Sequence, residues 1–232
     1  MLHHAQLIRA RLLGNDADNG IRRTQIATAA MPFNLPDPGR CSGDKTLTIA
    51  VFDDSPSVAG LGGSDPISQR YREARIAFRH LAQACDCDKE FAAVLHFDHP
   101  SSGDVPPARI RGRSLRHINR GLRQPREFGT SELAHALSAA TVMAERFDSD
   151  HIQLVVFSDF MLTDPEPEPV YAALLNFPGT VHAVVLTAKA PYQLSNEAAV
   201  TVTHIDSGSE SGEVAGALLR SLTEHRIGFT AA

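Results

Sequence analysis

The stretch LTIAVFDDSPS, residues 47–57, decides the fold because a short apolar run ends abruptly in side chains that carry oxygen. Its first six residues are apolar or β-branched, which is typical of a strand buried on both faces of a parallel sheet. The next five supply Asp53, Ser55 and Ser57 in the spacing D-x-S-x-S. Because alternate residues of an extended chain point the same way, one carboxylate and two hydroxyls can share a face. The stretch therefore predicts a strand whose carboxyl end carries oxygen ligands.

Two other segments are expected to bring oxygen ligands to the same place. The run IQLVVFSD, residues 152–159, predicts a second buried strand that ends at Asp159. The tripeptide FGT, residues 128–130, places Thr130 after a glycine that allows close approach of the backbone. Ligands of open α/β sheets bind at the carboxyl ends of the strands. Since carboxylates and hydroxyls are hard ligands that suit magnesium better than zinc, we expect a Mg²⁺ site here, with Mn²⁺ or Ca²⁺ as alternatives.

From residue 45 onward, apolar runs alternate with helical periodicity. This pattern predicts an α/β fold with a doubly wound, mostly parallel six-stranded sheet, helices on both faces and one antiparallel edge strand. Expected strands cover residues 47–53, 91–97, 108–112 (the edge strand), 152–158, 180–186 and 200–205. Expected helices cover residues 67–85, 114–122, 131–147, 168–175 and 212–226. We predict a domain over residues 45–232, preceded by an N-terminal extension and linker over residues 1–44.

On these residues the sequence resembles the von Willebrand factor A (vWA) domains, a Rossmann-like family related to integrin inserted domains. The metal-ion-dependent adhesion site of that family combines D-x-S-x-S, a threonine from a Gly-Thr loop and an aspartate at a later strand end. The matching residues are Asp53, Ser55, Ser57, Thr130 and Asp159. Their order and spacing agree with the family over residues 45–226. One departure is Phe160, which stands where many members carry glycine and which we expect to shape the rim of the site.

The resemblance implies a protein-binding adaptor rather than an enzyme. In the family the two serines and often the threonine bind the metal directly, while the aspartates act partly through water. The remaining position on the metal is left for an acidic side chain of a partner protein. The resemblance also implies partners such as AAA+ ATPases of the MoxR type, with which intracellular bacterial vWA proteins often work.

An arginine-rich segment precedes the Thr130 loop. Between Arg109 and Arg126 the sequence has seven arginines and no acidic residue, although the net charge of the whole chain is -5. If residues 114–122 are helical, four arginines fall on one stripe: Arg113, Arg116, Arg120 and Arg123. The stripe is either a solvated face or, together with Phe160, a surface that contacts an acidic partner. Nucleic acid is disfavoured by the overall negative charge and by the lack of interleaved aromatic residues.

Composition is that of an ordinary globular protein, with 43% hydrophobic and 21% charged residues. No apolar run reaches the roughly 18 residues that span a bilayer, and Arg9 and Arg11 interrupt the N-terminal run where a signal peptide is uncharged. Three cysteines argue against a disulfide scaffold and favour a reducing, cytoplasmic compartment. Cys85 and Cys87 have C-x-C spacing, but no second cysteine or histidine pair completes a metal site.

Other functions remain as alternatives to the adaptor. A structural or assembly component could use the N-terminal extension and the arginine segment for its contacts. A Mg²⁺-dependent hydrolase is less well supported, because no nucleophile and base can be paired from the sequence. An aspartate-nucleophile phosphatase needs D-x-D, and Ser55 occupies the place of the second acid. A receiver domain is too compact for acidic segments as far apart as Asp53 and Asp159.

Overall fold

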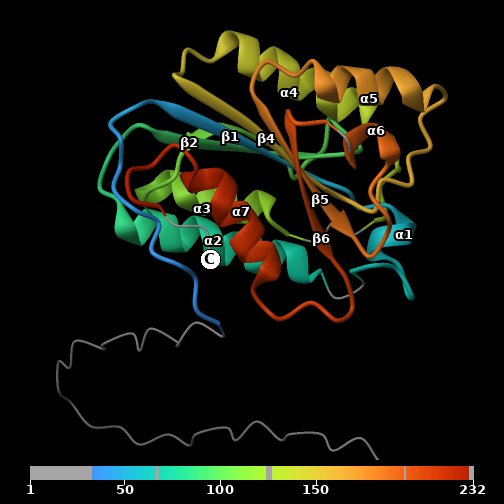
Figure 1. Ribbon diagram of the computed structural model, residues 1–232, viewed down its shortest axis with the longest axis horizontal. Helices are drawn as coiled ribbons and strands as arrows, with labels where there is room; N and C mark the ends of the chain where they lie inside the picture. Colours follow the sequence, from blue (N-terminus) through green and yellow to red (C-terminus); the bar gives the residue numbers. More distant parts are fainter. Residues whose placement is uncertain (1–32, 66–67, 124–126, 196, 230–232) are drawn as a thin grey trace, which may run out of the picture. The chain divides into compact units, whose positions relative to one another are not determined.

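The computed structural model describes residues 33–65, 68–123, 127–195 and 197–229. These residues form a six-stranded sheet with the order β3-β2-β1-β4-β5-β6 (Figure 1). The strands are β1 (Thr46–Phe52), β2 (Glu90–His96), β3 (Val105–Arg109), β4 (His151–Ser158), β5 (Thr180–Leu186) and β6 (Val200–Ile205). All neighbours pair in parallel except β2 and β3, which are antiparallel. The predicted mostly parallel sheet with one antiparallel edge strand is confirmed.

The edge strand lies three residues before its predicted position. The prediction of 108–112 avoided Pro106 and Pro107, but β3 contains both. Proline lacks a backbone N–H and is tolerated in a sheet at an edge, where one side of the strand has no neighbour. The remaining strands agree with their predicted positions to within one residue.

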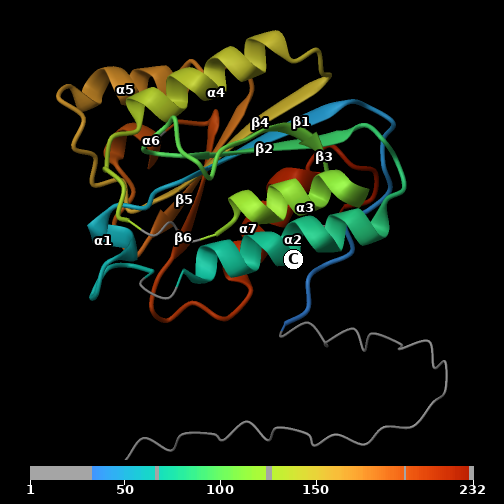
Figure 2. The same ribbon diagram turned by 180° about the vertical axis from the view of Figure 1, so that it is seen from behind.

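Helices cover both faces of the sheet, as predicted (Figures 1 and 2). One face is covered by α2 (Gln69–Ala84), α3 (Gly112–Gly121) and α7 (Glu213–Thr223). The opposite face is covered by α4 (Ala134–Arg146), α5 (Pro167–Leu175) and α6 (Tyr192–Ser195). The short α1 (Pro56–Ala59) directly follows β1. The four-residue helices α1 and α6 were not predicted, because one turn is too short to leave a periodic pattern.

Two hydrophobic clusters, one on each face, fill the space between sheet and helices. Phe52, Val94 and Val155 belong to the cluster under α2, α3 and α7. Val51, Leu95 and Val156 belong to the cluster under α4 and α5. Successive strand residues thus face opposite layers, which explains why β1 is an uninterrupted run of buried residues.

The connector, residues 33–44, packs against the domain. Phe33 and Leu35 lie against the cluster that α2 and α7 cover. Arg40 pairs with Ile227 through backbone hydrogen bonds of 2.9 and 3.0 Å. Residues 1–32 of the predicted N-terminal extension lie outside the described residues, so the boundary at residue 44 stays a prediction.

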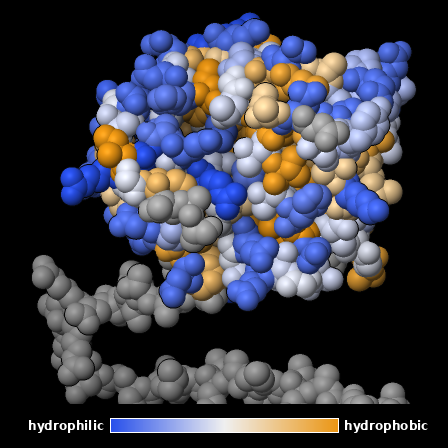
Figure 3. All heavy atoms as spheres, in the orientation of Figure 1, coloured by the Kyte–Doolittle hydropathy of each residue, from blue (hydrophilic) through white to orange (hydrophobic). Residues whose placement is uncertain are grey.

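Surface character agrees with a globular α/β domain. On the face drawn in Figure 3, hydrophobic side chains reach the surface in patches separated by hydrophilic ones. In the described part of the chain, every helix is too short or too polar to cross a bilayer.

Candidate metal centre

The tips of β1 and β4 meet at the carboxyl edge of the sheet. Phe52 is paired with Phe157, so the next residues, Asp53 and Ser158, lie side by side. Asp53 N donates to Phe157 O at 3.0 Å, and Ser158 Oγ donates to Asp53 Oδ2 at 2.6 Å. The chain leaves β1 toward β2 on one side and later returns to β4 on the other. This reversal makes the β1–β4 tip the topological switch point, where α/β sheets bind ligands.

The loop after β1 holds two hydroxyls at the spacing of adjacent metal ligands. Ser55 N donates to Asp53 Oδ1 at 2.9 Å, which folds the loop back over the strand end. Ser55 Oγ and Ser57 Oγ are then 3.0 Å apart. Neighbouring oxygens around an octahedral Mg²⁺ are about 3.0 Å apart, given a metal–oxygen distance of about 2.1 Å. The two hydroxyls therefore fit two adjacent positions on one such ion.

Two buried carboxylates lie at the ends of β1 and β4. Asp53 has no exposed surface and Asp159 is only 5% exposed. Burial raises the pKa of Asp53 to about 6; hydrogen bonds from Ser158 and Ser55 act against this rise, and the charge of Asp159 adds to it. Burial next to a second carboxylate disfavours the ionised form of Asp53, whereas a divalent cation between the two groups would favour it. The donor set thus fits a hard dication.

Thr130 lies on a loop that is tied to both strand tips. Gly129 N donates to Asp54 O at 2.9 Å, and Thr163 N donates to Ser131 O at 3.1 Å. Thr130 is exposed, and its hydroxyl accepts a 3.4 Å hydrogen bond from Glu132 N. The structure therefore brings Asp53, Ser55 and Ser57 into contact, places Asp159 within electrostatic reach, and leaves Thr130 on the adjoining loop.

A buried network that was not predicted from the sequence supports the loop. Arg70, on α2, is fully buried and pairs with Asp54 at 2.6 Å and with Asp65 at 2.8 Å. Arg70 Nη2, the nitrogen that pairs with Asp54, also donates to Asp53 O at 3.0 Å. Tyr71 donates its hydroxyl hydrogen to the Asp54 carboxylate at 2.7 Å. The network anchors the backbone of the candidate ligand Asp53 to α2, and nothing in the spacing of the sequence marks Arg70 as buried.

A second missed residue, Asp164, sets the start of α4. Its two carboxylate oxygens accept hydrogen bonds from Leu133 N at 2.9 Å and Ala134 N at 3.0 Å. The helix was predicted to begin at Ser131 but begins at Ala134, because this distant carboxylate supplies the cap. The cap also fixes the loop that carries Thr130.

The structure explains the unusual residue after Asp159. Phe160 has a φ of 55°, a left-handed conformation that glycine adopts without strain and other residues rarely adopt. Its N–H donates to Ser158 Oγ at 2.8 Å. The Phe160 side chain is only 5% exposed and packs in the cluster under α4 and α5, which leaves little of it for a partner to contact. Its neighbour Met161 is 64% exposed and is the apolar side chain that reaches solvent here.

The four predicted arginines of the stripe are all exposed. Arg113, Arg116 and Arg120 lie on α3, and Arg123 follows that helix. Three more arginines lie on the neighbouring helix α2, which runs beside α3 in both ribbon views (Figures 1 and 2): Arg72, Arg75 and Arg79. Burial, followed by the charges of Arg123, Arg79 and Arg72, lowers the pKa of Arg75. Among the described arginines, the ones that form ion pairs with carboxylates are Arg70, Arg111 and Arg226, none of which belongs to these seven. The seven arginines together form a basic face, which we call the α2–α3 face.

Comparison with known proteins gives a fold. No family model matches the sequence, and no curated protein matches it. The structure is similar to a von Willebrand factor type A protein from Catenulispora acidiphila, with a TM-score of 0.55 and 15% identity over 77% of this chain. The chain has a vWA fold. It is also similar to SpaC, a pilus adhesin from Lactobacillus rhamnosus GG, with a TM-score of 0.57 and 12% identity over 80% of this chain.

The vWA fold accounts for only part of each of those proteins. The matched region spans 42% of the Catenulispora chain and 31% of the adhesin. At 15% and 12% identity, the likeness extends to the arrangement of strands and helices, as the sequence analysis predicted. The likeness therefore carries no information about what the carboxyl edge of this chain binds.

Proposed function

We propose that this chain is a protein-binding module in which a Mg²⁺ ion at the carboxyl edge of the sheet binds an acidic side chain of a partner. The pair of hydroxyls, Ser55 Oγ and Ser57 Oγ, 3.0 Å apart beside the buried carboxylates of Asp53 and Asp159, carries this proposal. Mn²⁺ or Ca²⁺ could take the same oxygen ligands. The chemistry is coordination rather than turnover, so the module acts as an adaptor and not as an enzyme.

The metal would make binding switchable. Without a cation, two buried carboxylates face an approaching acidic residue and repel it. With a dication bound, the residual positive charge attracts that residue and one coordination position accepts its oxygen. Ser55, Ser57, Asp53 and Asp159 would hold the ion, and Thr130 would join from the adjoining loop.

The α2–α3 face gives the proposed partner a second contact. Because β3 is antiparallel to β2, α3 begins at the amino edge and runs toward the carboxyl edge, so its C-terminal end lies on the side of the Thr130 loop. Arg120 and Arg123 therefore lie on the side of the candidate metal centre. Arginine pairs with carboxylates through two parallel hydrogen bonds, so an acidic partner would satisfy both surfaces. The AAA+ ATPases of the MoxR type, named by the vWA resemblance, are the first partner class to test.

Retention of proteins from native lysate tests the metal bridge. The wild-type chain should retain a partner in Mg²⁺, release it in EDTA and rebind it when Mg²⁺ is restored. Asp53→Ala should abolish this retention. Asp148→Ala is the matched control, because that aspartate is fully exposed and precedes β4, at the opposite end of that strand from the candidate ligands. Full, chelator-insensitive retention by Asp53→Ala would show that the metal bridge is wrong.

Charge reversal tests the α2–α3 face separately. The double variant Arg116→Glu/Arg120→Glu should slow association with the retained partner roughly tenfold at low salt, and much less at 0.5 M salt. Arg146→Glu, on the exposed surface of α4 on the opposite side of the sheet, is the control and should leave the rate unchanged. Equal rates for the double variant and the control would remove the face from the binding surface.

A further inference from the structure

The amino edge of the sheet gathers three thiols and one carboxylate. Cys41 comes from the connector, Cys85 and Cys87 from the loop after α2, and Glu90 is the first residue of β2. One ligand atom from each of these four residues lies within 4.8 Å of all the others. The C-x-C pair alone predicted no metal site, because no second pair follows it in the sequence. In the structure one cysteine and one glutamate from separate segments lie beside it.

The separations suit a tetrahedral zinc site. With zinc–sulfur distances of about 2.3 Å, ligand atoms around a tetrahedral Zn²⁺ lie about 3.7 Å apart, so small side-chain rotations would close this group around the ion. Cys87 N donates to Cys85 Sγ at 3.3 Å. Burial raises the pKa of Cys87 to about 12, with hydrogen bonding to Cys85 and Cys41 as the next causes.

Glu90 is a buried carboxylate with an unsatisfied oxygen. Glu90 is 5% exposed, and its Oε1 accepts no hydrogen bond from the described residues. Arg226 Nε and His225 Nε2 lie 3.2 and 4.0 Å from this oxygen. Burial raises the pKa of Glu90, and the charge of Arg226 lowers it. Buried carboxylates are normally paired and hydrogen-bonded or bound to metal. Glu90 is paired with Arg226 but its Oε1 accepts no hydrogen bond from the described residues, and this oxygen beside three thiols is the observation that points to a ligand.

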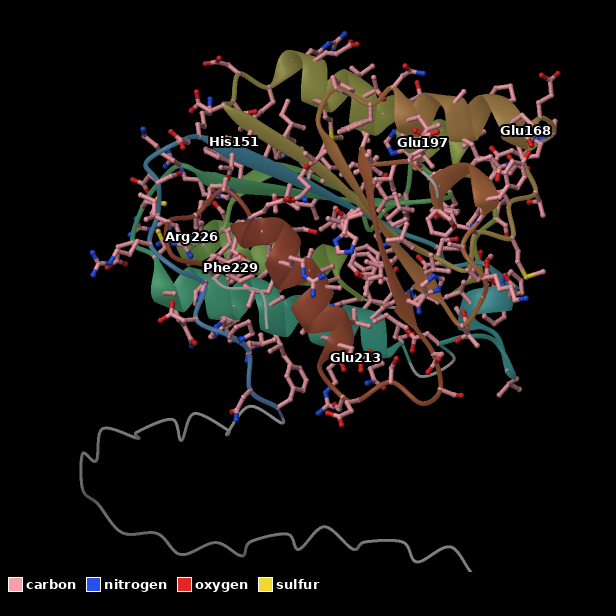
Figure 4. All side chains as sticks on the ribbon, in the orientation of Figure 1. His151, Glu168, Glu197, Glu213, Arg226 and Phe229 are labelled. Carbon is pink, nitrogen blue, oxygen red and sulfur yellow. The ribbon has the colours of Figure 1, made fainter. Side chains whose placement is uncertain are left out.

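The backbone around the cluster is held on several sides. Lys89 Nζ donates to Gly43 O, and Arg111 donates to Asp86 O. Thr46 N donates to Lys89 O at 2.9 Å. Arg226, labelled in Figure 4 beside the connector, donates to Pro38 O at 3.3 Å. The three segments that carry the four side chains are thus fixed relative to one another before any ion binds.

Charge and softness select the ion. Thiolates are soft ligands that favour zinc over magnesium. Three thiolates and one carboxylate around a dication leave an excess of negative charge. Three cationic groups lie beside the cluster: Lys89 stands between Cys87 and Glu90 in the sequence, Arg111 donates to Asp86 O, and Arg226 Nε is 3.2 Å from Glu90 Oε1. Their positive potential would stabilise such a centre.

We propose that Cys41, Cys85, Cys87 and Glu90 bind one Zn²⁺ ion as a structural site that fastens the connector to the amino edge of the sheet. Binding converts the three thiols to thiolates and releases their protons to solvent, while Glu90 binds as a carboxylate. With all four positions filled by protein, the site is closed and has no position for a substrate. The proposal is independent of the function proposed for the carboxyl edge.

Metal titration of the full, reduced chain under anaerobic conditions tests the site. Wild-type protein should bind one Zn²⁺ per chain. With Co²⁺ in its place, the protein should show the thiolate-to-cobalt charge-transfer absorption and the intense visible bands of four-coordinate cobalt. Saturating zinc should raise the melting temperature by roughly 10 °C, the shift expected of a ligand present at about a thousand times its Kd.

Variants locate the ligands. Cys41→Ser, in the connector, should lower zinc affinity roughly 100-fold or more, and Glu90→Gln should lower it while keeping the three-thiolate cobalt absorption. Glu145→Gln is the matched control for Glu90→Gln: it changes an exposed glutamate of α4, on the other face of the sheet, and should leave zinc stoichiometry and the cobalt spectrum unchanged. Circular dichroism of each variant reports whether it folds.

Two results would overturn the proposal. One is wild-type protein that is folded and fully reduced but binds no zinc and gives no cobalt–thiolate absorption. The other is a Cys41–Cys85 or Cys41–Cys87 disulfide found by mass spectrometry in protein prepared without oxidant, which would make the cluster a redox pair.

Discussion

The two edges of one sheet gather opposite kinds of ligand. The carboxyl edge presents hydroxyls and carboxylates, hard oxygens from loops that directly follow their strands. The amino edge presents sulfur atoms and one carboxylate from the connector, from the loop after α2 and from the start of β2. The parallel sheet imposes the first arrangement, because its switch point collects the loops after β1 and β4. No such rule operates at the amino edge, where the connector supplies what the strand pattern lacks.

The edges also differ in how a buried arginine is used. At the carboxyl edge Arg70 pairs with two carboxylates, Asp54 and Asp65, at 2.6 and 2.8 Å. At the amino edge Arg226 lies against the single carboxylate of Glu90 at 3.2 Å, and its Nη2 has no hydrogen-bond acceptor among the described residues. The first arginine completes a network, whereas the second is only partly satisfied.

Removal of each arginine should give the largest difference between the edges. Arg70→Met leaves two carboxylates buried without their cation and should lower the free energy of unfolding by about 3–5 kcal/mol in EDTA at pH 7. Arg226→Met should cost about 2 kcal/mol, because Glu90 can take up a proton and become neutral. Urea unfolding measures both.

Arg72→Met is the control for this pair, since its side chain is exposed beside Arg70 on α2, and it should change stability by less than about 0.5 kcal/mol. If Arg226→Met proved the more damaging of the two, the contrast between a complete and an incomplete network would be wrong.

Acid should affect the two edges with opposite sign. At the amino edge, burial and then the charges of His151 and Arg226 lower the pKa of His225 to about 4, from a usual value of 6.5. Below pH 6.5 the unfolded chain binds a proton there that the folded chain does not, so stability is lost as the pH falls toward 4.

At the carboxyl edge the pKa of Asp53 is raised to about 6, from 3.8. Between these values the folded chain holds the extra proton, so Asp53 adds stability as the pH falls.

Single variants separate the two contributions. Between pH 7 and 4.5 in EDTA, His225→Gln should lose about 2 kcal/mol less stability than wild type, and Asp53→Asn about 2 kcal/mol more. Urea unfolding at a series of pH values gives the slopes. Parallel curves for the two variants would mean that the edges do not differ in their proton linkage.

The carboxyl edge could be predicted from the sequence, and the amino edge could not. The patterns of residues 47–57 and 152–159 predict buried strands with candidate ligands at their ends. The parallel pairing of β1 and β4 then brings those ends together. Ser158 is the last residue of β4 and Asp164 lies in the loop that follows it. Only the structure shows that Ser158 donates to Asp53 and that Asp164 caps α4.

Cys41 shows why the amino edge was missed. It lies 44 residues before Cys85 in a connector whose path over the domain depends on packing of Phe33 and Leu35. Local pattern carries no information about such a path. The same applies to Arg70. The sequence pattern does not distinguish it from the exposed Arg72 and Arg79, and its burial is explained only by its ion pairs with Asp54 and Asp65.

The smallest expected effect isolates one ligand from the fold around it. Ser57 is partly exposed and its hydroxyl contacts only Ser55 Oγ among the described side chains, so Ser57→Ala should change the free energy of unfolding in EDTA by less than about 0.5 kcal/mol. Loss of one metal–oxygen bond should still weaken Mg²⁺ binding about tenfold, which isothermal titration calorimetry measures as about 1.4 kcal/mol. Ser42→Ala, a serine next to Cys41, is the control and should leave Mg²⁺ affinity unchanged. Equal Mg²⁺ affinity in wild type and Ser57→Ala would mean that the 3.0 Å pair of hydroxyls belongs to loop structure alone, and the carboxyl edge would then have no stronger claim to a metal than its two aspartates give it.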